Sequence, residues 1–212
     1  MTWRRWLPLS GIVFVALAVL TILVSGSTPG TDDPASKVLS FYNDHQNRQI
    51  LASFIFAAAV PFVVIFACVA AQRWGGVGGG PRVWPLVLVG GSVLLGATIL
   101  AAATIHFALA DGADNDVAAA GLQMLNVIDN DFWVGTNAAL GVMMLGAAGT
   151  LLLVPLRGAR WLGWIALMLG IALYIPFADF FALLASLLWI LVASVVLFRG
   201  TERAPTAEPT VE

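Results

Sequence analysis

Three polar side chains enter apolar segments of this sequence from the same side, and they are its best candidates for chemistry. His106, Asn137 and Tyr174 each lie five or six residues from an aspartate at the end of their segment. At 1.5 Å per helical residue, each lies roughly 7–9 Å inside the segment. With Asp129 and Asp131 they form a candidate outward-facing pocket. The alternative, which we favour at this stage, is that they only make hydrogen bonds between helices, because polar groups in lipid pair with one another.

Two histidines and one cysteine limit the metal and redox chemistry of the chain. Cys68 stands alone, so no internal disulfide, C-x-x-C redox pair or cysteine zinc site can form. Haem ligation by two imidazoles is disfavoured because His45 lies in a polar run. A metal held by His106 with Asp129 or Asp131 lacks a ligand-spacing motif. We expect no cofactor and no metal. An enzyme is disfavoured because G-x-S-x-G and H-E-x-x-H are also absent from the sequence.

The composition indicates that lipid covers much of this protein. Of its 212 residues, 60% are apolar and 10% are charged, against roughly 45–50% and 25% in soluble domains. A soluble fold of this size needs a polar exterior that so few charges cannot supply. The net charge of −2 gives no reason to expect nucleic acid as a partner.

Six apolar segments are predicted to cross the membrane as helices. About 20 apolar residues span a hydrocarbon core of roughly 30 Å, and a helix closes its backbone hydrogen bonds within itself, as lipid requires. The predicted spans cover about residues 7–24, 50–71, 85–110, 132–154, 161–177 and 180–198. The expected fold class is therefore all-α, a polytopic membrane helix bundle.

The last two spans share one apolar stretch, from Trp161 to Phe198, which is too long for a single crossing. Its only charge is Asp179, and a charged residue at the bilayer centre is costly. Pro176 is disfavoured inside a continuing helix but suits a tight connection. We interpret the stretch as a helical hairpin whose turn lies at the outer interface.

The basic residues predict that both termini lie in the cytoplasm. Eight of the ten Lys and Arg fall on the side of the N-terminus, and only Lys37 and Arg48 fall on the other side with all nine Asp. This distribution matches the positive-inside rule, so we expect a multi-pass protein of the cell membrane, in a bacterial plasma membrane. One alternative stays open. Residues 1–26 resemble a cleaved signal peptide in outline, although their 18-residue apolar run is longer than the usual 7–15.

Two outer connections carry amphipathic patterns. The first follows Asp33-Pro34, a pair typical of a helix start, and keeps apolar residues on one face to about residue 45. The second runs from Asp114 or Asp116 to about Ile128. Both are expected to form short helices that lie along the outer membrane surface or continue into the next span.

Residues 1–199 are expected to form one transmembrane domain of six helices. Residues 200–212 contain two prolines and all three glutamates, and we expect them to form a disordered cytoplasmic tail. The connection at residues 72–84 contains five glycines but no Lys-Ser or Lys-Thr pair. It is therefore interpreted as a flexible linker rather than a phosphate-binding loop.

Three segments suggest a family. They are R-W-L-G-W-I-A-L-M-L-G at residues 160–170, F-Y-N-D-H-Q-N-R at 41–48 and N-V-I-D-N-D at 126–131. Each resembles part of a group of uncharacterised six-helix actinobacterial integral membrane proteins, a domain-of-unknown-function family. The resemblance extends over most of the chain and implies a six-helix fold and a high-GC Gram-positive source. It implies no activity and no catalytic residue.

The leading functional hypothesis is a non-enzymatic integral membrane protein that binds membrane lipids, or another membrane protein, through its outer helices. The paired amphipathic segments and the lack of a catalytic constellation favour it. The alternative is a small transporter or membrane enzyme that uses the outer pocket around His106, Asn137 and Tyr174.

Overall fold

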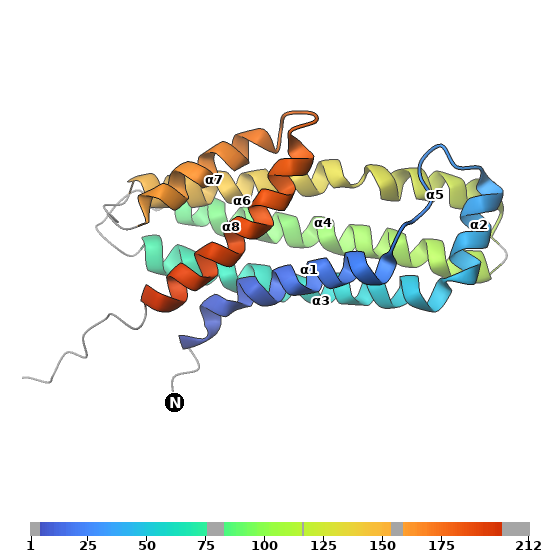
Figure 1. Cartoon of the computed structure of the whole chain (residues 1–212), viewed down its shortest axis with the longest axis horizontal. Helices are drawn as coiled ribbons and strands as arrows, with labels where there is room; N and C mark the ends of the chain where they lie inside the picture. The colour runs from blue at the N-terminus through green and yellow to red at the C-terminus, as the bar shows by residue number, and fades with distance from the viewer. Residues whose placement is uncertain (1–4, 76–82, 116, 154–158, 201–212) are drawn as a thin grey trace, which may run out of the picture.

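The computed structural model describes residues 5–75, 83–115, 117–153 and 159–200. Within these ranges the chain is helical and contains no strand, so the all-α prediction is confirmed there (Figure 1). The helices are η2 (Leu7–Leu9, a 3-10 turn), α1 (Ser10–Ser25), α2 (Ala35–Asp44), α3 (Gln46–Gly75), α4 (Val83–Asp114), α5 (Ala119–Asp131), α6 (Trp133–Leu153), α7 (Arg160–Ala172) and α8 (Asp179–Gly200). Most of the predicted glycine linker, and the predicted tail after residue 200, lie outside the described residues.

Five helical stretches in the described residues are long and apolar enough to cross a membrane. They are Leu7–Ser25, Gln46–Gly75, Val83–Asp114, Ala119–Leu153 and Asp179–Gly200. The fourth joins α5 and α6 across a slight break at Phe132. Each stretch contains one of the predicted spans, and the arrangement is compatible with a multi-pass membrane protein.

The predicted span over residues 161–177 is shorter in the structure. α7 has 13 residues, or about 20 Å of helix, which is less than the roughly 30 Å of a hydrocarbon core. The chain leaves the helix after Ala172 and turns before Asp179. Pro176 has no N–H with which to continue a helix, and Phe177 takes a left-handed φ of 70°. Both features end the helix earlier than its apolar pattern predicts.

Close contact between α4 and α6 sets the centre of the bundle, where α4 packs against α3 on one side and α6 on the other. A Cβ added at Gly91 of α4 would overlap the backbone of Met143 in α6. A Cβ added at Gly146 of α6 would overlap the backbone of Leu88 in α4. Lipid gives no hydrophobic reward for helix association, so membrane helices use small residues to bring their backbones together. These two glycines do so here.

A cap closes one end of the bundle (Figure 1). It consists of α2, α5 and the adjoining ends of α3 and α4, and we use the word in that sense below. Its apolar core is a second cluster of buried side chains, separate from the main core: Val38, Tyr42, Leu109, Ala110, Ala113 and Leu122. α2 and α5 coincide with the two amphipathic outer segments. α5 buries Leu122 and Asn126 and leaves Met124 and Ile128 exposed.

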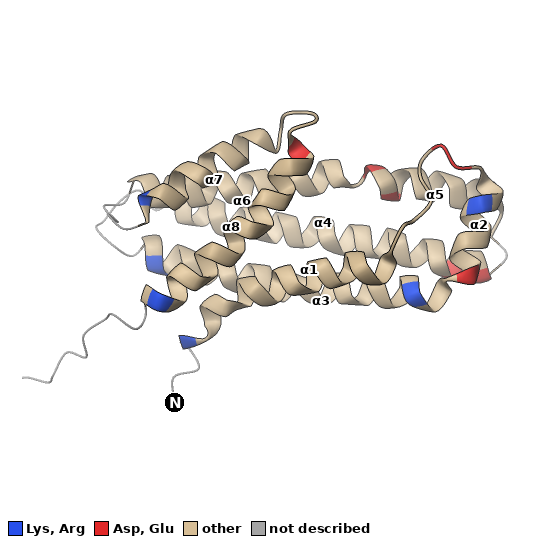
Figure 2. Cartoon of the chain, viewed as in Figure 1, with Lys and Arg blue, Asp and Glu red and all other residues tan. Residues whose placement is uncertain are grey.

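Charge separates the two ends of the bundle (Figure 2). Basic residues mark the end of α3, the start of α7 and the end of α8, all at the end opposite the cap; they are Arg73, Arg160 and Arg199. The acidic residues of the described chain lie between the middle of the bundle and the cap. The end opposite the cap is therefore basic, whereas the cap end carries acidic residues together with Lys37 and Arg48.

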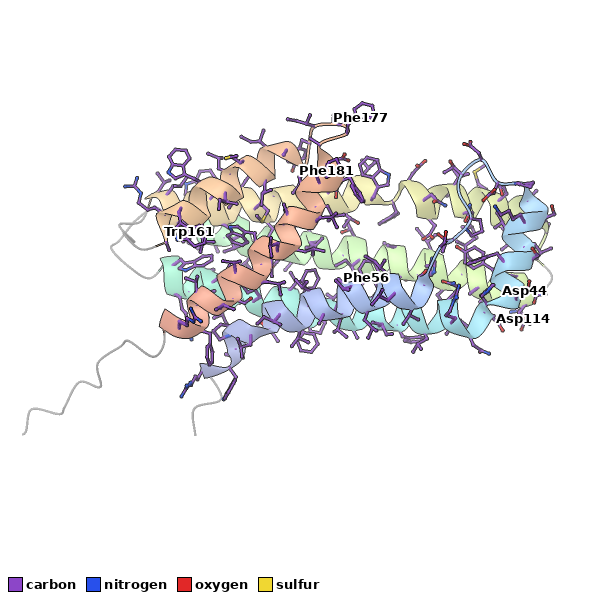
Figure 3. All side chains as sticks on the ribbon, in the orientation of Figure 1. Asp44, Phe56, Asp114, Trp161, Phe177 and Phe181 are labelled. Atoms are coloured by element: carbon purple, nitrogen blue, oxygen red, sulfur yellow. The ribbon has the colours of Figure 1, made fainter. Side chains whose placement is uncertain are left out.

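The α7–α8 hairpin covers only part of the bundle's length. Its turn, where Phe177 projects away from the other helices, lies near the middle of the long axis, whereas α3, α4 and α5 extend to the cap (Figures 1 and 3). Ile175, Phe177, Phe180 and Phe181 are all exposed at this turn. The side of the bundle between the turn and the cap therefore lacks the cover of these two helices.

Gly91→Ala is expected to lower the free energy of unfolding by about 1–3 kcal/mol, because the new Cβ would push α4 away from α6. Gly90→Ala is the matched control, since a Cβ there meets nothing within 4 Å. The control should be unchanged, or stabilised by up to about 1 kcal/mol through helix propensity. Thermal unfolding of the two purified variants in the same detergent measures the difference. Equal midpoints would contradict the close α4–α6 contact.

Candidate functional site

Four helices contribute polar side chains to one connected group beneath the cap. His106 of α4 has its Nδ1 2.8 Å from Asp129 Oδ2 of α5 and its Nε2 2.8 Å from Gln49 Oε1 of α3. Ser25, the last residue of α1, donates its hydroxyl to Gln49 Oε1 over 2.9 Å. Gln49 Nε2 donates in return to the Ser25 carbonyl over 3.0 Å. These four residues are called the His106 cluster below.

Both ring nitrogens of His106 contact an oxygen of another side chain. Gln49 Nε2 donates to a carbonyl, so Gln49 Oε1 faces the imidazole. Asp129 Oδ2 lies against the other ring nitrogen. Neither nitrogen is therefore left without a partner, and the His106 and Asp129 side chains are both only 15% exposed.

The position of the cluster along the helices follows from helix rise. The 24 residues from Gln49 to Arg73 of α3 correspond to about 36 Å, and the 22 residues from Trp84 to His106 of α4 correspond to about 33 Å. A hydrocarbon core is roughly 30 Å thick. A membrane that begins at the arginine end of the bundle therefore ends close to the His106 cluster.

A cavity of about 370 Å³ extends from the His106 cluster toward the middle of the bundle. Ser25, His106 and Asp129 line its polar end. The remaining wall is mainly apolar and comes from α1, α3, α4, α6 and α8; it includes Phe14, Phe56, Ile99, Leu140 and Leu187. Phe56 lies near mid-length in Figure 3, whereas Asp44 and Asp114 mark the cap end. The cavity is therefore polar at one end and apolar along the bundle axis.

The cavity opens sideways rather than only toward the cap. Ile22 of α1 and Trp133 of α6 both line it, yet their exposed fractions are 63% and 47%. Both belong to helical stretches long and apolar enough to cross a membrane. A molecule beside the bundle at this level can reach the cavity between α1 and α6.

A second buried polar pair lies deeper in the wall. Asn137 of α6 lines the cavity and donates its Nδ2 to Asp179 Oδ2 over 3.2 Å. Asp179 begins α8 directly after the hairpin turn and is 6% exposed. The sequence predicted that this carboxylate would lie at the outer membrane interface. The structure adds that protein covers it and that Asn137 gives it a hydrogen bond from a neighbouring helix.

The structure brings three of the five candidate residues to one cavity and leaves two outside it. His106, Asp129 and Asn137 line the cavity, and Tyr174 and Asp131 do not. Tyr174 donates its hydroxyl to the Ala138 carbonyl over 2.8 Å and is half exposed. Asp131 is also exposed. Tyr174 is therefore a packing residue of the α6–α7 contact rather than a wall of this cavity.

Sequence reasoning missed Ser25 and Gln49, which it assigned to an outer loop. The available signal was the spacing of Gln49 and Ser53, one helical turn apart at the start of a span. Ser53 donates its hydroxyl to the Gln49 carbonyl over 3.0 Å, and both side chains are buried. Two buried polar residues on one helix face predict polar partners on a neighbouring helix.

Within the described residues, no group of three or more His, Cys, Asp or Glu side chains could hold a metal ion. Comparison with protein-family models, with curated proteins and with solved structures finds no match for this chain. The resemblance to the actinobacterial membrane proteins therefore stays a prediction.

Tyr42 of α2 covers the cluster from the cap side. Its ring lies edge-on to the His106 ring, with centroids 5.8 Å apart, and the residue is fully buried. Its hydroxyl has no hydrogen-bond partner among the described residues. Burial raises the pKa of the Tyr42 phenol above its ordinary value of 10.0, and the Asp129 carboxylate raises this pKa further.

Tyr42→Phe is expected to keep the ring contact and to leave stability at neutral pH unchanged or raised, because it removes a buried hydroxyl that lacks a partner. A raised pKa in the folded state contributes stability that is present below pH 10 and is lost as the pH rises above it. The wild-type unfolding midpoint should therefore fall more steeply above pH 10 than that of Tyr42→Phe.

Tyr174→Phe is the matched control, since it removes the other tyrosine hydroxyl and with it a hydrogen bond worth about 0.5–1.5 kcal/mol. Thermal unfolding across pH 7 to about 11 in detergent compares the three proteins. A larger loss of stability at neutral pH for Tyr42→Phe than for Tyr174→Phe would show that the buried hydroxyl has a partner.

Proposed function

We propose that this protein is an integral membrane protein that binds a single lipid-like amphiphile in the cavity between α1 and α6. One observation carries the proposal: a mainly apolar cavity with a polar cluster at one end, open at its side. Ligand cavities are typically about 300–1,000 Å³ and largely apolar, with a few convergent polar groups that fix orientation. The volume of about 370 Å³ fits one such molecule.

The proposed ligand lies along the bundle axis, with its head at the His106 cluster and its tail beside Phe56 and Leu140. The basic end of the bundle faces the cytoplasm by the positive-inside rule. Helix rise then puts the His106 cluster at the outer boundary of the hydrocarbon. A lipid of the outer leaflet has its polar head at this depth, so it can enter sideways without leaving the membrane.

The proposed topology places both termini in the cytoplasm and treats α7 and α8, the fifth and sixth membrane segments, as a hairpin that crosses incompletely. α7 is too short to span, and the exposed aromatic side chains at its turn suit contact with lipid. Asp179 is compatible with this depth because Asn137 pairs with it inside the protein. α2 and α5 then cover the bundle on the outer side.

Ala102→Phe is expected to weaken binding of an alkyl chain about tenfold or more, because Ala102 lines the cavity and a phenyl group there occupies ligand volume. Ala101→Phe is the matched control, since the adjacent Ala101 is exposed and lies outside the cavity wall. A tenfold change corresponds to about 1.4 kcal/mol.

The measurement uses dibromostearyl probes with alcohol, amine or acid heads, added to the full-length protein in nanodiscs. Bromine quenches tryptophan at short range, and Trp133 lines the cavity. The relevant signal is the saturable quenching that Trp133→Phe removes. Equal affinities for Ala102→Phe and Ala101→Phe with every head would reject the cavity as the binding site.

A second candidate function is acyl hydrolysis of the bound amphiphile, and one observation favours it. Ser25 Oγ lies 3.5 Å from His106 Nε2, and His106 Nδ1 contacts Asp129, which is the order of a serine nucleophile, base and orienting acid. We rank it second because His106 Nε2 lies nearer to Gln49 Oε1, at 2.8 Å, than to Ser25 Oγ, and the Ser25 hydroxyl donates to the same Gln49 oxygen. In this arrangement the serine hydroxyl donates to an amide oxygen and not to the imidazole that would have to act as its base.

This ranking predicts that an alkyl fluorophosphonate leaves Ser25 unmodified in the folded protein. Intact-mass analysis after incubation in nanodiscs gives the result, and Ser25→Ala serves as the comparison. A phosphonyl adduct on the wild type that is absent from Ser25→Ala would reverse the ranking and make hydrolysis the leading function.

A further inference from the structure

We infer that the ligand of this cavity carries an uncharged head that donates hydrogen bonds, as a hydroxyl does. The cavity would therefore select long-chain alcohols and glycerides over fatty acids and phospholipids. This inference rests on the proposed function and specifies the ligand class for that cavity. The reason is that most polar groups of the cavity wall can accept a further hydrogen bond but have no free hydrogen to donate.

Each hydroxyl group of the cavity wall already donates a hydrogen bond within the protein. Thr21 donates to the Leu17 carbonyl over 3.0 Å, Ser53 to the Gln49 carbonyl over 3.0 Å, and Thr136 to the Phe132 carbonyl over 3.4 Å. Ser25 donates to Gln49 Oε1. A hydroxyl whose only hydrogen is engaged in this way can still accept hydrogen bonds. These four groups therefore face a ligand as acceptors.

The charged groups of the wall also favour a ligand head that donates hydrogen bonds. Among the described residues, His106 and Asp129 are the only charged or titratable side chains that line the cavity. Asp129 binds His106 through Oδ2, so its Oδ1 is available as a strong acceptor. His106 has both nitrogens engaged. An anionic head would therefore meet a carboxylate, and no Lys or Arg among the described residues lines the cavity. Arg48 lies beside Gly26 of the wall but is not itself part of the lining.

A cationic head is disfavoured for a different reason. Asp129 already binds His106, so only part of its acceptor capacity is left to offset the desolvation of an ammonium group. The remaining donors in the wall are neutral: the indole N–H of Trp133 and the second Nδ2 hydrogen of Asn137. An uncharged hydroxyl head can donate to Asp129 and lose little hydration, which makes it the best match.

The test compares dibromostearyl alcohol, dibromostearic acid and dibromostearylamine by the Trp133-dependent quenching described above. The three probes share one tail, so their order reports the head alone. We expect the alcohol to bind about tenfold or more tightly than the ionised acid at pH 8, since a hydroxyl can donate a hydrogen bond to the Asp129 carboxylate and an ionised acid cannot. We also expect it to bind more tightly than the amine.

Asp129→Asn should weaken alcohol binding and bring the alcohol and the acid to within about threefold of each other, because it removes the charge at nearly constant shape. Asp131→Asn is the matched control, since Asp131 is exposed, lies two residues away and does not line the cavity. It should preserve the wild-type order. The relative affinities of the three probes are measured on the wild-type protein alone. The test of head selectivity therefore remains valid even if Asp129→Asn misfolds.

Three outcomes distinguish a failure of this inference from a failure of the proposed function. Saturable binding in which the acid or the amine equals or exceeds the alcohol would overturn this inference and leave the proposed function standing. Saturable binding of none of the three probes would overturn the proposed function itself. An alcohol preference that Asp131→Asn removes as fully as Asp129→Asn would assign the selectivity to surface charge and overturn the role of Asp129.

Discussion

The structure depends on one constraint, that polar groups within an apolar bundle must find their partners inside the protein. His106 meets it by contacting Asp129 and Gln49, which in turn hold Ser25. α1, α3, α4 and α5 are joined at one point in this way. Asn137 and Asp179 do the same for α6 and α8. Each pair fixes how two helices are rotated about their axes, which apolar packing alone specifies poorly.

The cavity is a consequence of where these helices stop. The α7–α8 hairpin turns near mid-length, while α3 and α4 continue to the cap (Figure 1). The wall between α1 and α6 is therefore not covered by a further helix at the level of the His106 cluster. The hairpin contributes to the cavity wall only through Leu183 and Leu187, in the first half of α8.

The His106 cluster also links the cavity to the cap. Tyr42 contacts the imidazole from above, and Asn126 and Asn130 of α5 hold the loop that follows Ser25 through the carbonyls of Gly30 and Pro29. A ligand head at Asp129 would thus contact the helix that carries these asparagines. α2 and α5 support the site through these contacts.

The sequence by itself determined the apolar composition, the long helices that contain five of the six predicted spans, and the gathering of arginines at one end of the bundle. These features follow from hydropathy and charge along the chain, together with a fixed rise of 1.5 Å per residue. The same rise predicted the depth of His106 and Asn137. Only the tertiary structure decided that Ser25 and Gln49 join His106, and that Tyr174 and Asp131 lie outside the cavity. A linear pattern gives a residue's height on its helix, whereas its partners depend on how neighbouring helices are rotated and how closely they approach.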